Sequence, residues 1–312
     1  MFRFPQMPPE AKQLPTVDHC NGMPCFQFEE FTRVSLIGSG GYGKVYYGLY
    51  NKKEVVVKIL ADAEQLDVLK EAKFSHRLNH VNIVDFVAIC PLKKAIMLEY
   101  IAFDMKEFGG NSAISSVDVL LEELNRCKFE GFEHLFMCVA QQIVDGLLYL
   151  HSQGVAHRDI KPGNVLIGNK HLKGLSVEDK ERDWKSKPCL AKLTDFGESW
   201  GKISQTSQAA CSHTLNIYRG TPAFMAPEVI DPFTRPTEMR EDQLKKADIW
   251  SLGMVLFCLT NPSYKIPYYK EIRSSNMIGD WQNVLKRNIS KGLIPEADAA
   301  YSPHRCSVAS TS

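Results

Sequence analysis

The chain has 312 residues, which is long for a single hydrophobic core, so one large domain in two lobes or two small domains is expected. Lysine and arginine total 37 and aspartate and glutamate total 36, which leaves a net charge of +1 at pH 7. This balance excludes a general electrostatic attraction to nucleic acids or membranes. Any binding of phosphate must therefore be local.

The cysteines and the apolar runs bear on the compartment. Nine cysteines are scattered without a C-x-x-C pair. The absence of such a pair, together with the odd number, argues against a disulfide framework and against a zinc site, and favours a reducing compartment. The chain start has no apolar signal-peptide core. The most apolar run, IWSLGMVLFCL (249–259), is too short to span a bilayer and predicts a buried helix. We expect a protein of the cytosol or the nucleus.

The first hundred residues predict a small sheet with one helix. Five prolines in residues 1–25 favour a disordered tail, which we extend to residues 1–28. Short β-branched and aromatic runs then follow one another as in an antiparallel meander. The segment AEQLDVLKEAKFSHRL (63–78) has apolar residues at helical spacing. Two further strand-like runs follow. We therefore assign residues 29–101 to a small lobe.

Helical patterns dominate the remainder. SSVDVLLEEL and EHLFMCVAQQIVDGLLYLH have helical spacing, and we assign a large lobe to residues 102–285. The polar stretch GNKHLKGLSVEDKERDWKSKPC (168–189) predicts an exposed insertion on its composition. Residues 286–312 end in a serine-rich run without a helical apolar pattern. We expect an incomplete end of the lobe and a polar tail there.

The first chemical motif is LIGSGGYGKVYYG (36–48), which contains G-x-G-x-x-G at Gly38, Gly40 and Gly43. Glycines let backbone N–H groups approach phosphate oxygens without a Cβ in the way. A glycine-rich hairpin turn is an equally good explanation of the pattern alone. A dinucleotide site would need a strand, a turn and a helix. Here the glycines lie between two strand-like runs, which disfavours that site.

A lysine and a glutamate follow this motif. Lys58 lies in the β-branched run VVVKI (55–59), and Glu71 lies on the predicted helix. A lysine in a strand usually faces solvent, and so does a single glutamate on a helix. An ammonium beside a phosphate-binding loop would nevertheless have a function, and Glu71 can supply the anionic partner that it needs.

Two oxygen-bearing side chains suggest a magnesium site. Asp195 ends a predicted strand in TDFGES (194–199), where Gly197 permits a sharp turn, although a simple turn aspartate is common in any Asp-x-Gly. With Asn164 it offers two oxygen ligands suited to Mg²⁺, a hard cation. Asn164 closes the stretch VAHRDIKPGN (155–164), which crowds an imidazole, a guanidinium, a carboxylate, an ammonium and an amide together.

These motifs occur in a fixed order. The set comprises G-x-G-x-x-G-x-V (38–45), V-x-V-K (55–58), Glu71, H-R-D-x-K-x-x-N (157–164), D-F-G (195–197) and A-P-E (226–228). It resembles the eukaryotic protein kinases, and the resemblance runs from about Phe31 to the helix around Asp248–Gly253. Lys161 and GTPAFMAPE (220–228) are similar to the serine/threonine type, because tyrosine kinases lack this lysine.

The resemblance implies an α+β, bilobal protein-kinase fold, with a small mainly antiparallel-sheet lobe carrying one helix and a larger mainly helical lobe. It implies an enzyme that uses ATP and Mg²⁺ to phosphorylate serine and threonine hydroxyls of protein substrates. Lys58 would hold ATP phosphates and pair with Glu71, Asp159 would accept the proton of the acceptor hydroxyl, and Lys161 would steady the γ-phosphate. Asn164 and Asp195 would hold Mg²⁺. The residues implied for ATP binding are Ile37, Gly38, Ser39, Gly40, Gly41, Tyr42, Gly43, Lys44, Val45, Val56, Lys58, Glu99, Ile101 and Leu166.

Further roles follow from the same resemblance. Asp248 would brace the catalytic loop, and Leu98 would guard the back of the adenine pocket. Arg158 could pair with a phosphate on the loop between 197 and 226, where Ser212, Thr214 and Tyr218 are candidate acceptors with Thr214 first. A merely solvated serine- and threonine-rich loop is the alternative.

The chain also departs from the family pattern. Val56 stands where the family usually has alanine, so it should crowd the adenine. Ser75 stands where the family prefers a larger apolar residue, so it should loosen the active alignment. The last helices of the large lobe are expected to be missing, which would leave apolar surface for a regulatory partner. The alternative to an active kinase is therefore a truncated ATP-binding module that acts mainly through protein interaction.

Overall fold

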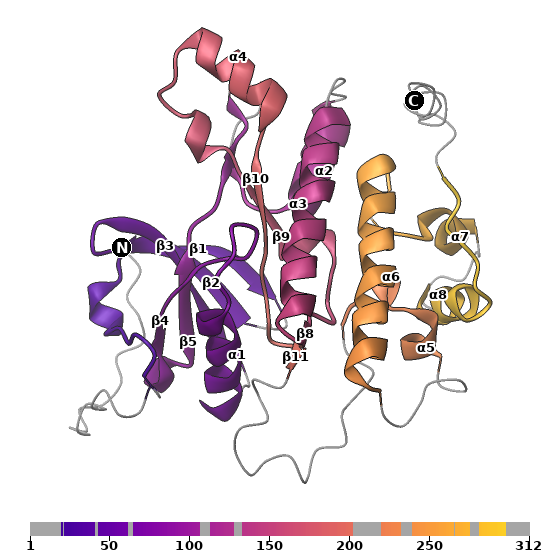
Figure 1. Cartoon of the computed structure of the whole chain (residues 1–312), viewed down its shortest axis with the longest axis horizontal. Helices are drawn as coiled ribbons and strands as arrows, with labels where there is room; N and C mark the ends of the chain where they lie inside the picture. Colours follow the sequence, from indigo (N-terminus) through magenta and orange to yellow (C-terminus); the bar gives the residue numbers. More distant parts are fainter. Residues whose placement is uncertain are drawn as a thin grey trace. The chain divides into compact units, whose positions relative to one another are not determined.

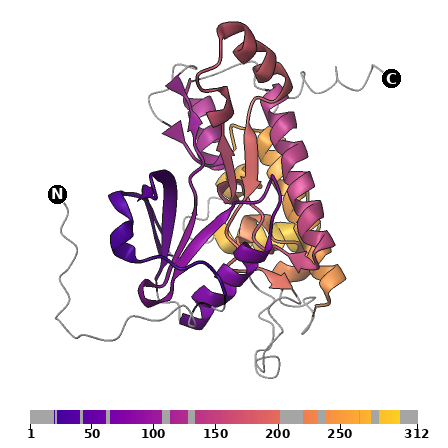
Figure 2. The same ribbon diagram turned by 60° about the vertical axis from the view of Figure 1, so that its left-hand side comes forward.

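The computed structural model describes residues 20, 22–40, 43–61, 65–106, 113–127, 133–201, 220–231, 239–264, 266–274 and 281–297 (Figures 1 and 2). The chain divides into two compact units. The first contains Met1–Leu69 and Val87–Leu98, and the second contains Lys70–Phe86 and Glu99–Ser312. A small sheet and a larger helical part are the two lobes that the sequence predicts.

The first unit is built on one five-stranded sheet with the strand order β1-β2-β3-β5-β4. Its strands are β1 (Thr32–Gly40), β2 (Gly43–Tyr50), β3 (Lys53–Leu60), β4 (Phe86–Cys90) and β5 (Ala95–Glu99). The β1–β2 and β2–β3 pairs are antiparallel, as the meander predicts.

The alternation of β3 decides which side chains form the core of this unit. Val55 and Val57 are buried and belong to one apolar cluster with Phe31 and Met97. Successive side chains of a strand point to opposite faces. Val56 and the intervening positions of β3 therefore lie on the other face, outside this core.

The predicted disordered tail is wrong for residues 22–28. Phe26 is buried, and its ring meets Tyr50 edge-on with the centroids 6.1 Å apart. Its N–H donates to the carbonyl of Ile89 at 3.1 Å, and the N–H of Ile89 donates to the carbonyl of Pro24 at 2.9 Å. The proline-rich composition misleads because this short segment covers the edge of β4, where unpaired backbone groups would otherwise be exposed.

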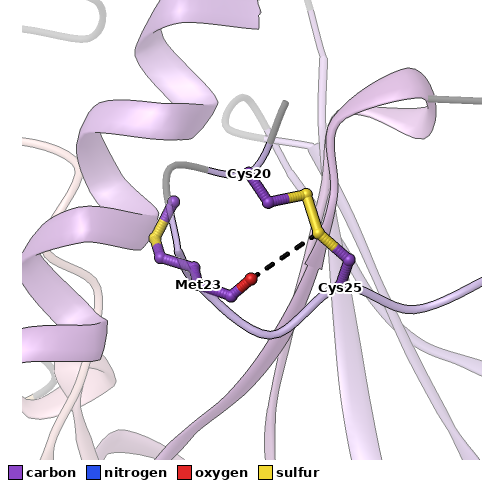
Figure 3. The surroundings of a disulfide bond; sticks show 3 residues. All are labelled: Cys20, Met23 and Cys25. Carbon is purple, nitrogen blue, oxygen red and sulfur yellow. Dashed lines mark hydrogen bonds between the residues drawn. A yellow bond between two sulfur atoms is a disulfide. The ribbon is translucent and has the colours of Figure 1, made fainter. Parts of the chain in front are cut away.

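The sequence argued against a disulfide framework, but the described residues do contain one disulfide. Cys20 and Cys25 form a disulfide, and Figure 3 shows it closing a small loop around Met23. The two Cα atoms lie 6.6 Å apart, which is within the range that a disulfide can bridge. The odd cysteine count did not exclude this pair, because a count cannot tell which cysteines a turn brings together. Among the described residues, Cys90, Cys138, Cys189 and Cys258 carry free thiols.

The second unit is mainly helical. Its helices are the C-terminal part of α1 (Gln65–Arg77), α2 (Val117–Cys127), α3 (Glu133–Ser152), α4 (Val177–Ser186), α5 (Pro227–Ile230), α6 (Glu241–Thr260), α7 (Tyr269–Ser274) and α8 (Trp281–Ser290). Three antiparallel strand pairs accompany them, namely β6 (Phe103–Asp104) with β7 (Ala113–Ile114), β8 (Val155–Ala156) with β11 (Trp200–Gly201), and β9 (Val165–Gly168) with β10 (Leu190–Leu193). Helix α3 packs against both β10 and α6 (Figure 1).

The apolar run 249–259 lies within α6, as predicted. Leu252, Val255 and Leu259 are buried, although Ile249 remains 52% exposed. No helix in the described part of the chain has both the length and the apolar character that crossing a membrane requires.

The predicted polar insertion is exposed but not irregular. It contains α4, in which no residue is buried. Ser176 caps this helix, since its hydroxyl accepts a hydrogen bond from the N–H of Asp179 at 3.1 Å. Composition alone hides this helix, whereas the Ser-x-x-Asp start is a recognisable capping signal.

The boundary predicted at residue 285 is also wrong. Helix α8 continues to Ser290 and packs against α5. Beyond it, the carbonyl of Leu293 accepts a hydrogen bond from the Tyr268 hydroxyl at 2.8 Å, and that of Ala297 accepts one from the Lys270 ammonium at 3.0 Å. Residues 286–297 thus belong to the packed part of the second unit. The absence of later lobe helices stays a prediction.

The close approach of β2 to β3 generates the first test. Gly43 has φ +131°, and a Cβ there would lie 2.0 Å from the carbonyl oxygen of Ile59. Gly43→Ala should destabilise the protein by about 1–3 kcal/mol, because the strands must move apart. Urea unfolding measures the change.

Gly40→Ala is the matched control for this substitution. A Cβ at Gly40 would meet nothing within 4 Å. Its effect on stability should stay within about 0.5 kcal/mol. Equal losses for both alanine variants would contradict the packing explanation.

Candidate active site

The stretch H-R-D-x-K-x-x-N forms a loop of the second unit. It leaves β8 at Ala156 and enters β9 at Val165 through a short 3-10 helix, Pro162–Asn164. Proline at the start of this turn fixes the backbone without costing a needed N–H. His157, Asp159 and Asn164 are all buried. A loop with so many buried polar groups needs partners for each of them.

Asp248 of α6 supplies the main anchor of this loop. Its carboxylate is fully buried. One oxygen accepts the N–H of His157 at 2.8 Å, and the other accepts the N–H of Arg158 at 2.7 Å. The Nε2 of His151 lies 2.9 Å from the first oxygen. The predicted role of Asp248 as a brace therefore has the geometry that it needs.

The ring of His157 ties the same loop to the segment that carries Asp195. Its Nδ1 accepts the N–H of Asp159 at 3.3 Å, so the proton must reside on Nε2. That nitrogen donates to the carbonyl of Thr194 at 3.0 Å. The side of the ring also contacts Phe196, with centroids 5.3 Å apart. His157 therefore has a structural role inside the protein and is not exposed for proton transfer.

Asp159 is the centre of the site. Its Oδ1 accepts a hydrogen bond from the Thr221 hydroxyl at 2.8 Å. Its Oδ2 lies 2.8 Å from the Lys161 ammonium and accepts from the Asn164 amide at 3.0 Å. The Lys161 ammonium also donates to the Thr221 hydroxyl at 2.8 Å. The carboxylate is thus fixed from both oxygens, with a cation beside it.

Thr221 is a site residue that the sequence analysis used only to assign the acceptor class. It follows Gly220, whose φ is +108° and where a Cβ would lie 2.4 Å from the carbonyl oxygen of Arg158. Only glycine allows that close approach, and the approach places Thr221 against Asp159. The Gly-Thr pair in GTPAFMAPE was the signal that could have identified Thr221.

Asp195 lies beside the loop because of backbone pairing. The N–H of Thr194 donates to the carbonyl of Asn164 at 3.1 Å, so the next residue, Asp195, starts close to Asn164. Asp195 has φ +67°, a left-handed conformation that is unusual for a residue with a side chain. Such outliers cluster at functional sites, where the surrounding structure enforces them.

Glu71 and Ser75 lie on the part of α1 that belongs to the second unit. Glu71 is buried, and a Cβ at Gly197 would lie 3.2 Å from its Oε2, so its carboxylate faces the D-F-G turn. Ser75 is buried too, and its hydroxyl donates to the carbonyl of Glu71 at 3.1 Å. The hydroxyl is therefore satisfied inside the helix. That it loosens the active alignment stays a prediction.

The remaining nucleotide contacts fall on both units and stay predictions. In the first unit, Val45 lies opposite Lys58 and Tyr47 lies opposite Val56 in the β2–β3 pair. Gly41 and Tyr42 lie outside the described residues, as do the phosphate acceptors Ser212, Thr214 and Tyr218. The further residues predicted for ATP are Ile37, Gly38, Ser39, Gly40, Gly43 and Lys44 in the first unit, and Glu99, Ile101 and Leu166 in the second.

A buried lysine beside Glu99 escaped the sequence analysis. Lys192 of β10 has only 6% of its side chain exposed. Its ammonium pairs with the Glu99 carboxylate and lies 3.4 Å from that of Asp85. The N–H of Asp85 also donates to Glu99 at 2.7 Å. These contacts hold Glu99 in place, and Glu99 is the first residue of the segment that is predicted to bind adenine.

A search against known protein families matches the protein kinase domain over residues 31–304. The chain belongs to the protein kinase family. Among curated relatives, it is 31% identical to the Serine/threonine-protein kinase chk-2 of Caenorhabditis elegans over 77% of this chain and 44% of that protein. It is 30% identical to the Serine/threonine-protein kinase Tao of Drosophila melanogaster over 75% of this chain and 19% of the relative. The Mitogen-activated protein kinase kinase kinase 13 of Homo sapiens is 29% identical over 80% of this chain and 20% of its own length.

The chain therefore spans less than half the length of these relatives. Family membership covers the domain and its fold.

The buried position of Asp248 leads to the second test. Asp248→Ala would leave the buried N–H of His157 and the part-buried N–H of Arg158 without an acceptor, at roughly 1–3 kcal/mol each. We expect a loss of about 3–5 kcal/mol in the free energy of unfolding, measured in urea.

Asp242→Ala on the same helix is the control. Asp242 is exposed and pairs only with Arg240 on the surface, so its loss should change stability by less than about 1 kcal/mol. A similar cost for the two variants would show that Asp248 does not anchor the loop.

Proposed function

We propose that this protein is an ATP-dependent kinase that transfers the γ-phosphate to serine and threonine hydroxyls of protein substrates. One observation carries the proposal. The Asp159 carboxylate is held between the Thr221 hydroxyl, the Lys161 ammonium and the Asn164 amide, within hydrogen-bond distance of each. A carboxylate fixed in this way can orient an acceptor hydroxyl and receive its proton.

The chemistry asks little more of the protein than positioning and charge. Phosphoryl transfer proceeds through a loose transition state, so the enzyme gains rate by aligning donor and acceptor and by stabilising negative charge. Lys161 is close enough to Asp159 to offset the charge of the carboxylate and to reach a phosphate oxygen. Lys58, which lies on β3 in the sheet of the first unit, would hold the phosphates of ATP. Glu71 would orient the Lys58 side chain.

The donor set fits magnesium. The Asn164 side chain directs its NH₂ group to Asp159, at 2.8 Å from the backbone carbonyl and 3.0 Å from the carboxylate, so its amide oxygen points the other way. Asp195 follows Thr194, which is bonded to the same asparagine. In the described residues no group of three or more histidine, cysteine or acidic side chains forms a metal site. Two oxygen ligands that leave the other positions to phosphate and water suit Mg²⁺, which would neutralise charge on the transferred group.

The acceptor class and the location complete the proposal. Lys161 and Thr221 form the contact expected of serine/threonine kinases, and the relatives at 31% and 30% identity bear serine/threonine-protein kinase in their names. A cytosolic or nuclear location, and a regulatory partner on the large lobe, rest on sequence alone. The near-neutral charge, +1, gives no support to a nucleic acid or a membrane as a partner.

The activity is tested with purified protein, labelled ATP, magnesium and a generic basic protein as acceptor. Label should appear on serine and threonine. Asp159→Asn keeps the shape but removes the base, so the rate should fall at least ~100-fold, with the melting temperature preserved. Mainly phosphotyrosine, or an Asp159→Asn rate equal to that of the wild type, would refute the proposal. An inactive wild type that still binds ATP would favour the interaction module.

Thr221 provides a sharper test of the geometry. Thr221→Ala removes the hydroxyl that joins Lys161 to Asp159, and a lost hydrogen bond to a charged group is worth about 1.5–3 kcal/mol. The rate should fall roughly 10- to 100-fold.

Thr221→Ser keeps the hydroxyl and is the matched control. It should retain most of the wild-type rate, measured in the same transfer assay. If the serine variant were as slow as the alanine variant, the methyl group would matter more than the hydrogen bonds.

A further inference from the structure

Two free cysteines meet outside the candidate active site. Cys138 lies on α3, and Cys189 immediately precedes β10. The Cys138 thiol lies 3.8 Å from the carbonyl oxygen of Cys189. Helix α3 packs directly on β10, and both views of the ribbon show the two elements side by side (Figures 1 and 2). The two cysteines, 51 residues apart in the sequence, are therefore neighbours in space.

A glutamine holds the two backbones in this arrangement. The Gln142 amide nitrogen donates to the Cys138 sulfur at 2.9 Å and to the Cys189 carbonyl at 3.0 Å. Its oxygen accepts the N–H of Ala191 at 2.9 Å and the Asn82 amide at 2.9 Å. These four hydrogen bonds use both the nitrogen and the oxygen of the Gln142 amide. The backbone segments that carry the two cysteines are therefore held next to each other.

The two thiols differ in access and in acidity. Cys189 is fully buried, whereas Cys138 is half-buried and so can be reached from solvent. The hydrogen bond with the Cys189 thiol, with that of Gln142 and the charge of Lys187 assisting, lowers the pKa of Cys138 to about 6. The same contact and burial raise the pKa of Cys189. A partly accessible thiolate beside a buried thiol is the arrangement of an attacking and a resolving cysteine.

We propose that Cys138 and Cys189 form a reversible disulfide when the protein meets hydrogen peroxide. The Cys138 thiolate attacks one peroxide oxygen, the O–O bond breaks, and the released hydroxide takes a proton from solvent to become water. The Cys138 sulfenic acid is then attacked by the Cys189 sulfur. The S–O bond breaks, the departing hydroxide takes the Cys189 proton, and a second water leaves. Two thiols are oxidised, and one peroxide is reduced to two waters.

The proposed Cys138–Cys189 disulfide would act on the segment that leads to the candidate active site. It would join α3 covalently to the residue just before β10, and β10 leads through Thr194 to Asp195. The pair is independent of the proposed function, because neither cysteine contacts Asp159, Lys161 or Thr221 in the described hydrogen bonds.

The experiment starts from fully reduced protein, freed of reductant and exposed to hydrogen peroxide at neutral pH. Remaining thiols are alkylated, and peptides are mapped by mass spectrometry without reduction. The expected result is a linked pair of peptides containing Cys138 and Cys189, which separates again after dithiothreitol. The Cys20–Cys25 disulfide, re-forming in the same sample, shows that linked peptides can be detected.

Two variants and one internal control make the result specific. In Cys189→Ser, a sulfenic-acid probe should label Cys138, which then lacks its resolving partner. In Cys138→Ser, Cys189 should stay a thiol. Cys258 is buried with its pKa raised to about 12, so in wild-type protein Cys138 should be alkylated at least ~10-fold faster. This comparison of alkylation rates uses wild-type protein, so it can be made even if one of the variants fails to fold.

Recovery of Cys138 and Cys189 as free thiols, under peroxide that oxidises Cys20 and Cys25, would overturn the proposal. So would linkage of Cys138 to a cysteine other than Cys189.

Discussion

The loop His157–Asn164 of this protein is organised around one buried carboxylate. Asp248 sits inside the second unit, fully buried, and accepts the backbone N–H groups of His157 and Arg158. A buried charge without partners would be very unfavourable, and so would two buried N–H groups without an acceptor. The Asp248 carboxylate therefore requires these N–H groups, and the N–H groups require the carboxylate. The loop cannot adopt a different backbone path without breaking both, which is why Asp159 is presented in one fixed position.

The second constraint acts on the other side of Asp159. Gly220 passes so close to the carbonyl of Arg158 that no side chain fits, and this contact delivers Thr221 to the carboxylate. Lys161 then closes a ring of three side chains by contacting both Asp159 and Thr221. The Asp159 carboxylate is thus held by its own loop and by the segment after the D-F-G turn. A change in the backbone at 220–221 would be transmitted directly to Asp159.

Strand β10 is the third fixed element, because it carries the chain toward Asp195. Gln142 and Asn82 contact its backbone at Ala191, and Lys192 pairs with Glu99 at the start of the segment predicted to bind the nucleotide. The Cys138–Cys189 pair lies at its start. Polar side chains of α3 and of neighbouring segments thus determine where β10 lies. A covalent bond at Cys189, the residue just before β10, would act on a strand that is otherwise positioned by hydrogen bonds.

The sequence by itself determined the family and the two-lobe fold, and it singled out the loop that carries Asp159 and Asn164. Phosphoryl transfer needs a base, a phosphate contact and oxygen ligands for a metal, and the sequence shows residues of these chemical types in the order of the kinase motifs. Local patterns also predicted the meander and the long helices, because periodicity reflects which face is buried. Tertiary structure decided the rest. Thr221 and Lys192 acquire their roles only through residues 60 and 93 positions away, and the ordering of residues 22–28 depends on an edge strand at residue 89. Composition cannot reveal such contacts, because a threonine, a lysine or a proline-rich segment looks ordinary until the fold brings its partner to it.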